Sequence, residues 1–326
     1  IYHRLTEDGM PKEDARFVLP YCLNSNFFCT VNAREFLNIL RAMLYGRGAA
    51  FPELLDLGKQ LLQQAREQAP GILTDFESRS KKDTLPFPAF PHPPGEKEGG
   101  VSLLNHTPNA AKTICSGVLL EKGYTRTDAE NIVQDAANRQ QILHWLLADS
   151  RPRALEAASY TFWVPGLSLS CLTHFARHRM QSIQIPSLLY ANRNAHVLPA
   201  FASEQQKELY QQAFAVANDL WNHLRQLGVS ENIGVYTLLS GNTIDIVTTM
   251  NARELLLFFR LRCCNRAQWE IRRHAEQMLQ LCRETDPEVF GAYGPSCVLG
   301  TCPEGRMSCG RQEEMKKKYL SGGSLI

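Results

Sequence analysis

An internal repeat constrains the fold of this chain more than any other feature of its sequence. Residues 5–41 align with residues 224–260 at a constant offset of 219, and both segments contain the run Asn-Ala-Arg-Glu, which starts at Asn32 and at Asn251. Matching segments so far apart indicate one structural unit that is used twice. The second repeat extends further upstream than the first, so we predict one and a half copies of a single unit.

A change in composition marks the boundary between the two repeats. Residues 81–100 contain five prolines, show no hydrophobic period and end in a glycine pair, which is typical of a semi-extended linker. We therefore predict a first repeat at residues 1–80, a linker at 81–100, a second repeat at 101–290 and a tail with several cysteines and glycines at 291–326.

The local patterns predict both strands and helices. Runs rich in β-branched and aromatic residues predict strands at residues 26–31, 101–104, 160–164 and 244–249, the third of them ending at Pro165-Gly166. Apolar residues at helical spacing predict helices at residues 33–44, 128–147, 203–227 and 252–283. Strands and helices do not alternate strictly, which favours an α+β fold with a mixed sheet and packed helices.

Composition narrows the possible partners and the compartment. The net charge of +2 gives no general reason to bind nucleic acid, and the longest apolar runs, such as residues 255–259, are too short to span a membrane. Ten cysteines without a secretory signal fit a reducing compartment. We expect a cytoplasmic protein without nucleic-acid or membrane partners, and the first residue, Ile1, suggests that an upstream part is missing.

The triplet Arg177-His178-Arg179 is the strongest indication of chemistry. It follows an apolar, helix-like run at residues 167–175, and seven residues separate it from Ser187. Adjacent cationic groups at the end of a buried element repel one another unless an anion neutralises them, and guanidinium groups bind phosphate oxygens in pairs. The pattern indicates a site for a phosphorylated ligand, whereas a solvated basic turn is the plainer alternative.

This triplet, with its spacing to Ser187, resembles the signature of the flavin-dependent thymidylate synthases. A second resemblance covers residues 250–256, Arg262 and residues 267–271, about seventy residues further on. The resemblance implies the fold of the thymidylate synthase-complementing proteins. It also implies conversion of dUMP to dTMP with FAD as cofactor and with NADPH and methylenetetrahydrofolate as co-substrates.

The resemblance also implies roles for individual residues. Arg262 would be the catalytic residue that stabilises the ionised uracil ring, while Ser187 and Arg16 would bind the nucleotide. The residues implied in cofactor binding are Arg177, His178, Arg179, Asn32, Asn38 and Asn251. For Asn32 and Asn251, capping of the helix that follows is an equally simple interpretation.

Each repeat departs from the family pattern at different positions. In the second repeat, aliphatic residues replace polar family residues at Ile185, Leu189, Val235, Ala157 and Leu257, whereas the first repeat keeps Arg16 and Asn38 but has Met43 at the position of Arg262. The family enzyme is a homotetramer with sites between subunits. We therefore expect a homo-oligomer, a tetramer in the simplest case, whose sites combine residues of both repeats.

Two other function classes remain open at this point. The second repeat could be a catalytically degenerate synthase-like copy that acts as a scaffold or regulatory partner of an intact copy. Nucleic-acid binding through Arg177 and Arg179 is a third class, without support from charge or aromatic residues.

The tail contains a candidate metal site. Cys297, Cys302 and Cys309 lie among glycines and a proline, but zinc requires four ligands and the spacing matches no standard zinc finger. Cys282 or a neighbouring chain would have to complete the site. Ordinary reduced thiols are the alternative, and we predict no metal in the catalytic site.

Overall fold

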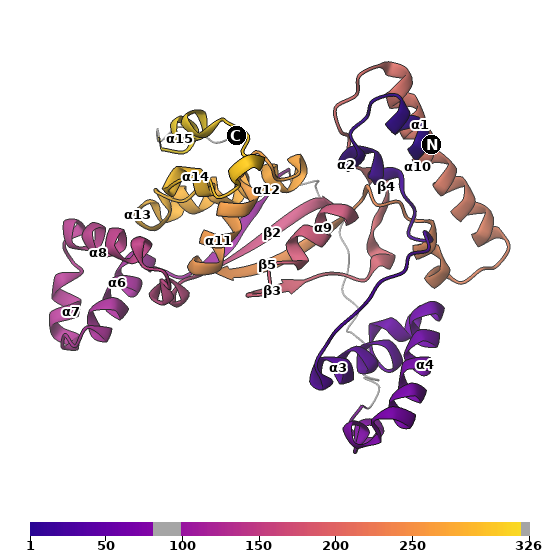
Figure 1. The fold of residues 1–326 in the computed structure, drawn as a ribbon, viewed down its shortest axis with the longest axis horizontal. Coiled ribbons are helices and arrows are strands. Elements are labelled where there is room, and N and C mark those ends of the chain that lie inside the picture. The colour runs from indigo at the N-terminus through magenta and orange to yellow at the C-terminus, as the bar shows by residue number, and fades with distance from the viewer. Residues whose placement is uncertain (81–98, 321–326) are drawn as a thin grey trace, which may run out of the picture. The chain divides into compact units, whose positions relative to one another are not determined.

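The computed structural model describes residues 1–80 and 99–320, in which the chain forms two compact units (Figure 1). The described part of the first unit consists of residues 1–80 and 187–242, and that of the second unit consists of residues 99–186 and 243–320. These units are defined by compactness, whereas the predicted repeats are defined by sequence. The two units do not coincide with the two repeats, so the arrangement of one and a half copies stays a prediction. The predicted linker lies almost entirely outside the described residues.

The first unit is mainly helical. Its α-helices are α1 (Tyr2–Glu7), α2 (Lys12–Ala15), α3 (Ala33–Leu44), α4 (Pro52–Gln68), α5 (Phe76–Arg79) and α10 (Glu204–Gln226). Short 3-10 helices occur at η1 (Arg16–Val18), η2 (Arg47–Ala50), η3 (Pro70–Leu73), η5 (Leu188–Tyr190) and η6 (Glu231–Thr237), and β4 covers Asn192–His196.

The second unit contains most of the sheet. Its strands are β1 (Ser102–His106), β2 (Ser159–Ser168), β3 (Gln181–Gln184) and β5 (Asn242–Asn251), the last of which begins one residue before the unit boundary. Its helices are α6 (Ala110–Glu121), α7 (Arg126–Ile132), α8 (Ala136–Ala148), η4 (Arg153–Ala157), α9 (Leu169–Ala176), α11 (Ala252–Arg262), α12 (Trp269–Thr285), α13 (Pro287–Phe290), α14 (Ser296–Leu299), η7 (Gly305–Met307) and α15 (Gln312–Leu320).

The sheet of the second unit has the strand order β1-β2-β5-β3. The pairs β1-β2, β2-β5 and β3-β5 are all antiparallel, and Met250 of β5 lies opposite Tyr160 on one side and Gln181 on the other. Strand β5 is therefore central, and it leads directly into α11. The α+β class predicted from the sequence is confirmed, and these pairings are antiparallel where a mixed sheet was expected.

Strand β2 does not end at Pro165-Gly166, as predicted, but continues to Ser168. The register with β5 shifts between Val164 and Leu167, and Gly166 adopts a φ of 61°. The backbone N–H of Gly166 donates to Asp245 Oδ1 at 2.8 Å, so the side chain of Asp245 satisfies a group that leaves the ladder. The Pro-Gly pair makes a bulge in a continuing strand.

Two predicted helices are each interrupted. The predicted helix at residues 128–147 consists of α7 and α8, and the Asp135 side chain caps α8 by accepting from the Ala137 N–H at 2.8 Å. The predicted helix at residues 252–283 consists of α11 and α12, and the Gln268 side chain caps α12 by accepting from the Glu270 N–H at 2.9 Å. Apolar spacing continues across both interruptions and conceals them.

Most other predicted elements are confirmed. Helix α3 has the predicted bounds, and α10 differs from its predicted range by one residue at each end. Strand β5 includes its predicted strand, and β1 begins one residue later and ends two residues later than predicted. The predicted strand at residues 26–31 is wrong: this segment is irregular, and Phe27 and Phe28 are 78% and 107% exposed. The matching strand β5 has β2 and β3 beside it, and a strand forms only where neighbours satisfy its backbone groups.

Aromatic side chains form the centre of the second unit. The rings of Phe290 and Tyr293 lie 4.7 Å apart, and Phe290 also contacts Tyr160 at 4.9 Å. Phe259 of α11 is fully buried against Phe290 and Tyr293. Helix α11 is therefore anchored to the core along one face.

In the first unit, a close approach of the backbone requires glycine at position 241. A side chain there would meet Phe17 Cβ and Phe214 Cζ at 2.9 Å. The Gly241 N–H donates to the Phe17 carbonyl at 2.7 Å, which joins the start of the chain to residues that lie far along the sequence. No helix within residues 1–80 and 99–320 is long and apolar enough to cross a membrane.

Phe259→Ala is expected to lower the free energy of unfolding of the second unit by about 3–5 kcal/mol, because it leaves a cavity in the aromatic cluster. Leu261→Ala, on the same helix at a site that is 47% exposed, should change it by less than about 1 kcal/mol. Urea denaturation followed by near-ultraviolet circular dichroism measures both. Equal effects of the two variants would contradict this packing.

Candidate active site

His178 is the buried link between the basic triplet and helix α11. The residue is 4% exposed, its Nδ1 lies 2.9 Å from Glu254 Oε1, and its Nε2 lies 3.0 Å from Arg262 Nε. The ring of Phe258 packs edge-on against the imidazole at 4.9 Å. Glu254, Phe258 and Arg262 are four residues apart, so they share one face of α11. A single histidine thus contacts this helix in its first turn and at its last residue.

The hydrogen bonds determine the proton position on His178. Arg262 Nε can only donate, so His178 Nε2 accepts and Nδ1 carries the proton that is donated to Glu254. Burial, assisted by the charge of Arg262, lowers the pKa of His178 to about 4. Burial raises the pKa of Glu254, while Arg253 opposes this shift. His178 is therefore a neutral, oriented imidazole at pH 7.

Arg262 is held in a half-buried position at the end of α11. Its Nε donates to His178, and its Nη2 donates to the carbonyl of His174 at 3.2 Å. Burial lowers the pKa of Arg262, and the neighbouring charge of Arg177 lowers it further. A half-buried guanidinium that is held in place near a second positive charge favours binding of an anion.

The two arginines of the triplet do not share the burial of His178. Arg177 ends α9 as its C-cap residue, and both Arg177 and Arg179 are exposed in this chain. The position of the triplet at the end of a buried element led us to expect that all three residues lose part of their water, and this expectation is wrong for Arg177 and Arg179. Side chains alternate between the two faces once the chain leaves the helix and extends toward β3, so only the central residue points inward.

A cavity of about 500 Å³ lies in the second unit at the start of α11. Its lining residues are Ser150, Pro152, Glu156, Met180, Asn251, Arg253, Glu254, Leu256, Leu257 and Arg260. Asn251 caps α11 by accepting from the Glu254 N–H at 2.9 Å, so the capping interpretation is confirmed, and its side chain also borders the cavity. Cavities of this size suit small molecules and parts of cofactors.

Sequence reasoning missed Glu254, although it contacts His178 and lines this cavity. The internal repeat contains a signal for it, because the same Asn-x-x-Glu spacing occurs at Asn32 and Glu35. The ion pair between Arg253 and Glu156, at the edge of the cavity, was also missed. Its two partners are 97 residues apart, so local patterns give no indication of it.

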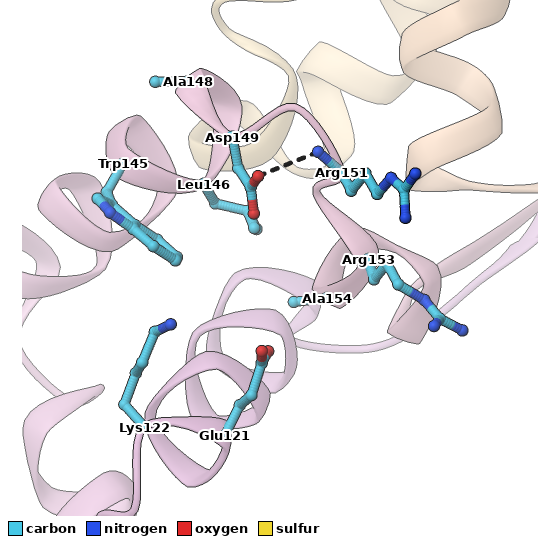
Figure 2. Close-up of a pocket in the computed structure, with 9 residues that line it drawn as sticks. All are labelled: Glu121, Lys122, Trp145, Leu146, Ala148, Asp149, Arg151, Arg153 and Ala154. Carbon is cyan, nitrogen blue, oxygen red and sulfur yellow. Dashed lines mark hydrogen bonds between the residues drawn. The ribbon is translucent and has the colours of Figure 1, made fainter.

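A second cavity, of about 570 Å³, lies between α6, α8 and the segment that follows α8 (Figure 2). The Lys122 amino group lies 4.9 Å from the centre of the Trp145 ring, and Figure 2 shows Arg151 and Arg153 pointing away from that ring. Ser150 and Pro152 line the first cavity and Arg151 and Arg153 line the second, so successive residues face different cavities.

The other predicted site residues belong to the first unit. Asn32 caps α3 by accepting from the Glu35 N–H at 2.9 Å, and Asn38 donates to Glu35 and accepts from Arg41 on the exposed face of that helix. Ser187 accepts from the Leu189 N–H at 3.4 Å, and Arg16 is half-buried at the start of η1. The structure therefore brings His178, Asn251 and Arg262 together in the second unit, where the exposed Arg177 and Arg179 flank His178 in the chain. The other four predicted site residues belong to the first unit: Asn32, Asn38, Ser187 and Arg16.

Comparison with known proteins assigns the chain to a family. The sequence model of the family described as thymidylate synthase complementing protein matches residues 1–71 and 102–288. The chain belongs to this family. The match includes the triplet, helix α11 and the first part of the chain.

Individual relatives agree with this assignment. The flavin-dependent thymidylate synthase of Geobacter sulfurreducens is 32% identical over 225 residues, which is 67% of this chain and 97% of that protein. The flavin-dependent thymidylate synthase of Clostridium tetani is 33% identical over 242 residues, 68% of this chain and 96% of that protein. A crystal structure of the UMP/dUMP methylase PolB from Streptomyces cacaoi, bound to 5-Br dUMP, matches with a TM-score of 0.52 and 21% identity, and the match covers 60% of this chain and 95% of that chain. This last likeness supports the fold.

The stability of the second unit is expected to fall by about 1–3 kcal/mol between pH 7 and pH 5. Burial lowers the pKa of both His178 and His274 to about 4, so in this range the unfolded chain binds protons that the folded unit does not bind. The raised pKa of Glu254 offsets part of the change. Urea midpoints measured at several pH values test this expectation.

Two variants distinguish the histidines. His274→Leu should reduce the change in stability between pH 7 and pH 5, because it removes one of the two buried imidazoles. The control His144→Gln, at an exposed position of α8, should leave this change in stability as it is in the unaltered protein. A stability that is constant or rises toward pH 5 in the unaltered protein would show that these histidines are not buried as neutral groups.

Proposed function

We propose that this protein is a flavin-dependent thymidylate synthase that converts dUMP to dTMP with FAD, NADPH and methylenetetrahydrofolate. Membership of the family and relatives of that name at 32% and 33% identity support the activity. The observation that carries the proposal is the fixed Arg262, held by His178 and the His174 carbonyl with Arg177 as its electrostatic neighbour. This arrangement suits an anionic nucleotide.

The residues around the first cavity fit part of a flavin. Leu256, Leu257 and Met180 offer apolar surface for a flat ring system, and Asn251, with its side-chain amide N–H groups, stands at the start of α11. When bound, FAD supplies the hydride chemistry, which no side chain can provide. Asn251 would contact the flavin ring. Arg177 and Arg179 would bind the phosphates of the cofactor, and His178 would fix the position of the segment that carries them.

The contribution of the chain itself is electrostatic and positional. Arg262 would stabilise negative charge on the uracil ring, and its half-buried position strengthens that interaction relative to water. Because Nε and Nη2 are already engaged, the guanidinium does not need to reorganise when the ring ionises. Ser187 and Arg16 would bind the phosphate or ribose of the nucleotide.

A complete site requires residues from both repeats. The aliphatic side chains of Ile185, Leu189 and Val235 cannot bind a phosphate, so Arg16 would supply that contact, with Asn32 and Asn38 on the flavin. We propose a homo-oligomer, a tetramer in the simplest case, in which the two repeats share each site. We place the reaction in the cytoplasm.

Two other aliphatic replacements favour one alternative function. Leu257 lines the first cavity where the family pattern has an Asn, and Ala157 replaces a family histidine nearby. A second repeat with such losses could act as a scaffold or regulatory partner of an intact copy.

The purified protein is expected to be yellow and to oxidise NADPH, with formation of dTMP when dUMP and methylenetetrahydrofolate are added. Absorbance and product analysis measure this. A colourless preparation that co-purifies with an active synthase would instead identify a scaffold.

Arg262→Lys is expected to reduce dTMP formation about 100-fold or more, because it keeps a charge but loses the fork held by His178. Arg16→Ala should weaken dUMP binding, seen as a raised KM for dUMP. The control Arg225→Ala, at an exposed position of α10, should change neither the rate of dTMP formation nor this KM. If neither Arg262→Lys nor Arg16→Ala alters nucleotide turnover, the composite site is wrong.

A further inference from the structure

Four cysteines from three separate segments line one cavity of about 300 Å³ in the second unit. Cys264 lies in the turn between α11 and α12, Cys297 lies in α14, and Cys302 and Cys309 lie in the loop before α15. The fourth member is therefore Cys264 and not Cys282, which is fully buried in α12 and does not line this cavity. Its partners in the tail are about thirty to forty-five residues away in sequence, which is why spacing alone did not identify it.

Hydrogen bonds already join the three segments that carry these cysteines. The Arg266 side chain donates to the carbonyls of Met307 at 2.9 Å and Ser308 at 3.2 Å, which links the Cys264 turn to the loop of Cys309. The Gln312 side chain donates to the carbonyls of Cys297 at 3.3 Å and Gly300 at 3.0 Å. Four thiols thus line one cavity whose walls are held together by other groups.

The backbone around the thiols has features that suit metal-bound sulfur. The Arg266 N–H donates to Cys264 Sγ at 3.5 Å, and the Asn265 side chain donates to Cys309 Sγ at 3.9 Å. Such bonds stabilise a thiolate over a thiol. Gly305 and Gly310 have φ angles of 49° and 72°, so the chain turns sharply after Cys302 and again after Cys309.

The four sulfur atoms are also electrostatic neighbours. Burial raises the pKa of the Cys297 thiol, and the adjacent thiols of Cys264, Cys302 and Cys309 raise it further. Four cysteine side chains around one cavity are the kind of donor set that a soft divalent cation such as Zn²⁺ prefers.

We propose that Cys264, Cys297, Cys302 and Cys309 together bind one Zn²⁺ ion and so fasten the tail to the turn between α11 and α12. Each thiol releases its proton to solvent on binding, and the complex of Zn²⁺ with four thiolates then has a net charge of −2 beside Arg260 and Arg266 of the same cavity. In the structure as it stands, residues 1–80 and 99–320 contain no group of three His, Cys, Asp or Glu side chains close enough together to hold a metal ion. The ion would therefore draw the sulfur atoms together, to about 3.8 Å from one another at a Zn–S distance of about 2.3 Å.

Metal analysis of the purified protein tests this proposal. Protein produced with zinc available and kept reduced should contain about one zinc per chain after dialysis. Cys264→Ser and Cys309→Ser should each lower the zinc content at least fivefold, whereas Cys22→Ser and Cys29→Ser, at exposed positions of the first unit, should leave it unchanged.

A measurement on the unaltered protein does not depend on whether these variants fold. Blocking of thiols with a mercurial should release the zinc, and removal of zinc should increase cleavage by protease within residues 296–311. Zinc at background level, with no uptake when zinc is titrated into the reduced protein, would overturn the proposal. Iron and sulfide in place of zinc would also overturn it.

Discussion

The hydrogen-bond pair at His178 is the interaction on which the rest of the site depends. Its imidazole receives the Arg262 Nε–H and donates to Glu254, so one buried, neutral side chain fixes both an anion-binding group and the first turn of α11. The alternative, a protonated His178 next to Arg262, would place two positive charges side by side in a buried position. The acid–base state of one residue therefore controls the geometry of the site.

Helix α11 transmits this geometry to the core and to the tail. Phe258 and Phe259 anchor it in the aromatic cluster, while Asn251 and Glu254 at its start border the first cavity. At its other end, the turn at Cys264 contacts the tail. A proposed zinc ion in the tail would therefore stiffen the same helix that carries Arg262, although the two proposals stand on different observations.

Much of the fold follows from local sequence, and much of the site does not. Helices α3 and α10 are predicted from apolar residues at helical spacing, and in the structure Asn32 and Ser203 cap them by accepting from N–H groups three residues further on. The interruptions at Asp135 and Gln268 were not predicted, because apolar spacing continues across them. The burial of His178 could not be predicted, since its partners are 76 and 84 residues away and only the folded sheet and helix bring them together.

The protonation state of His178 is the most direct test of the account, and heteronuclear NMR of its imidazole nitrogens measures it. At pH 7 the account predicts a neutral ring that carries its proton on Nδ1, with Nε2 accepting from Arg262. A doubly protonated ring, or a neutral ring protonated on Nε2, would contradict it, because neither could accept the hydrogen bond that holds Arg262 in place.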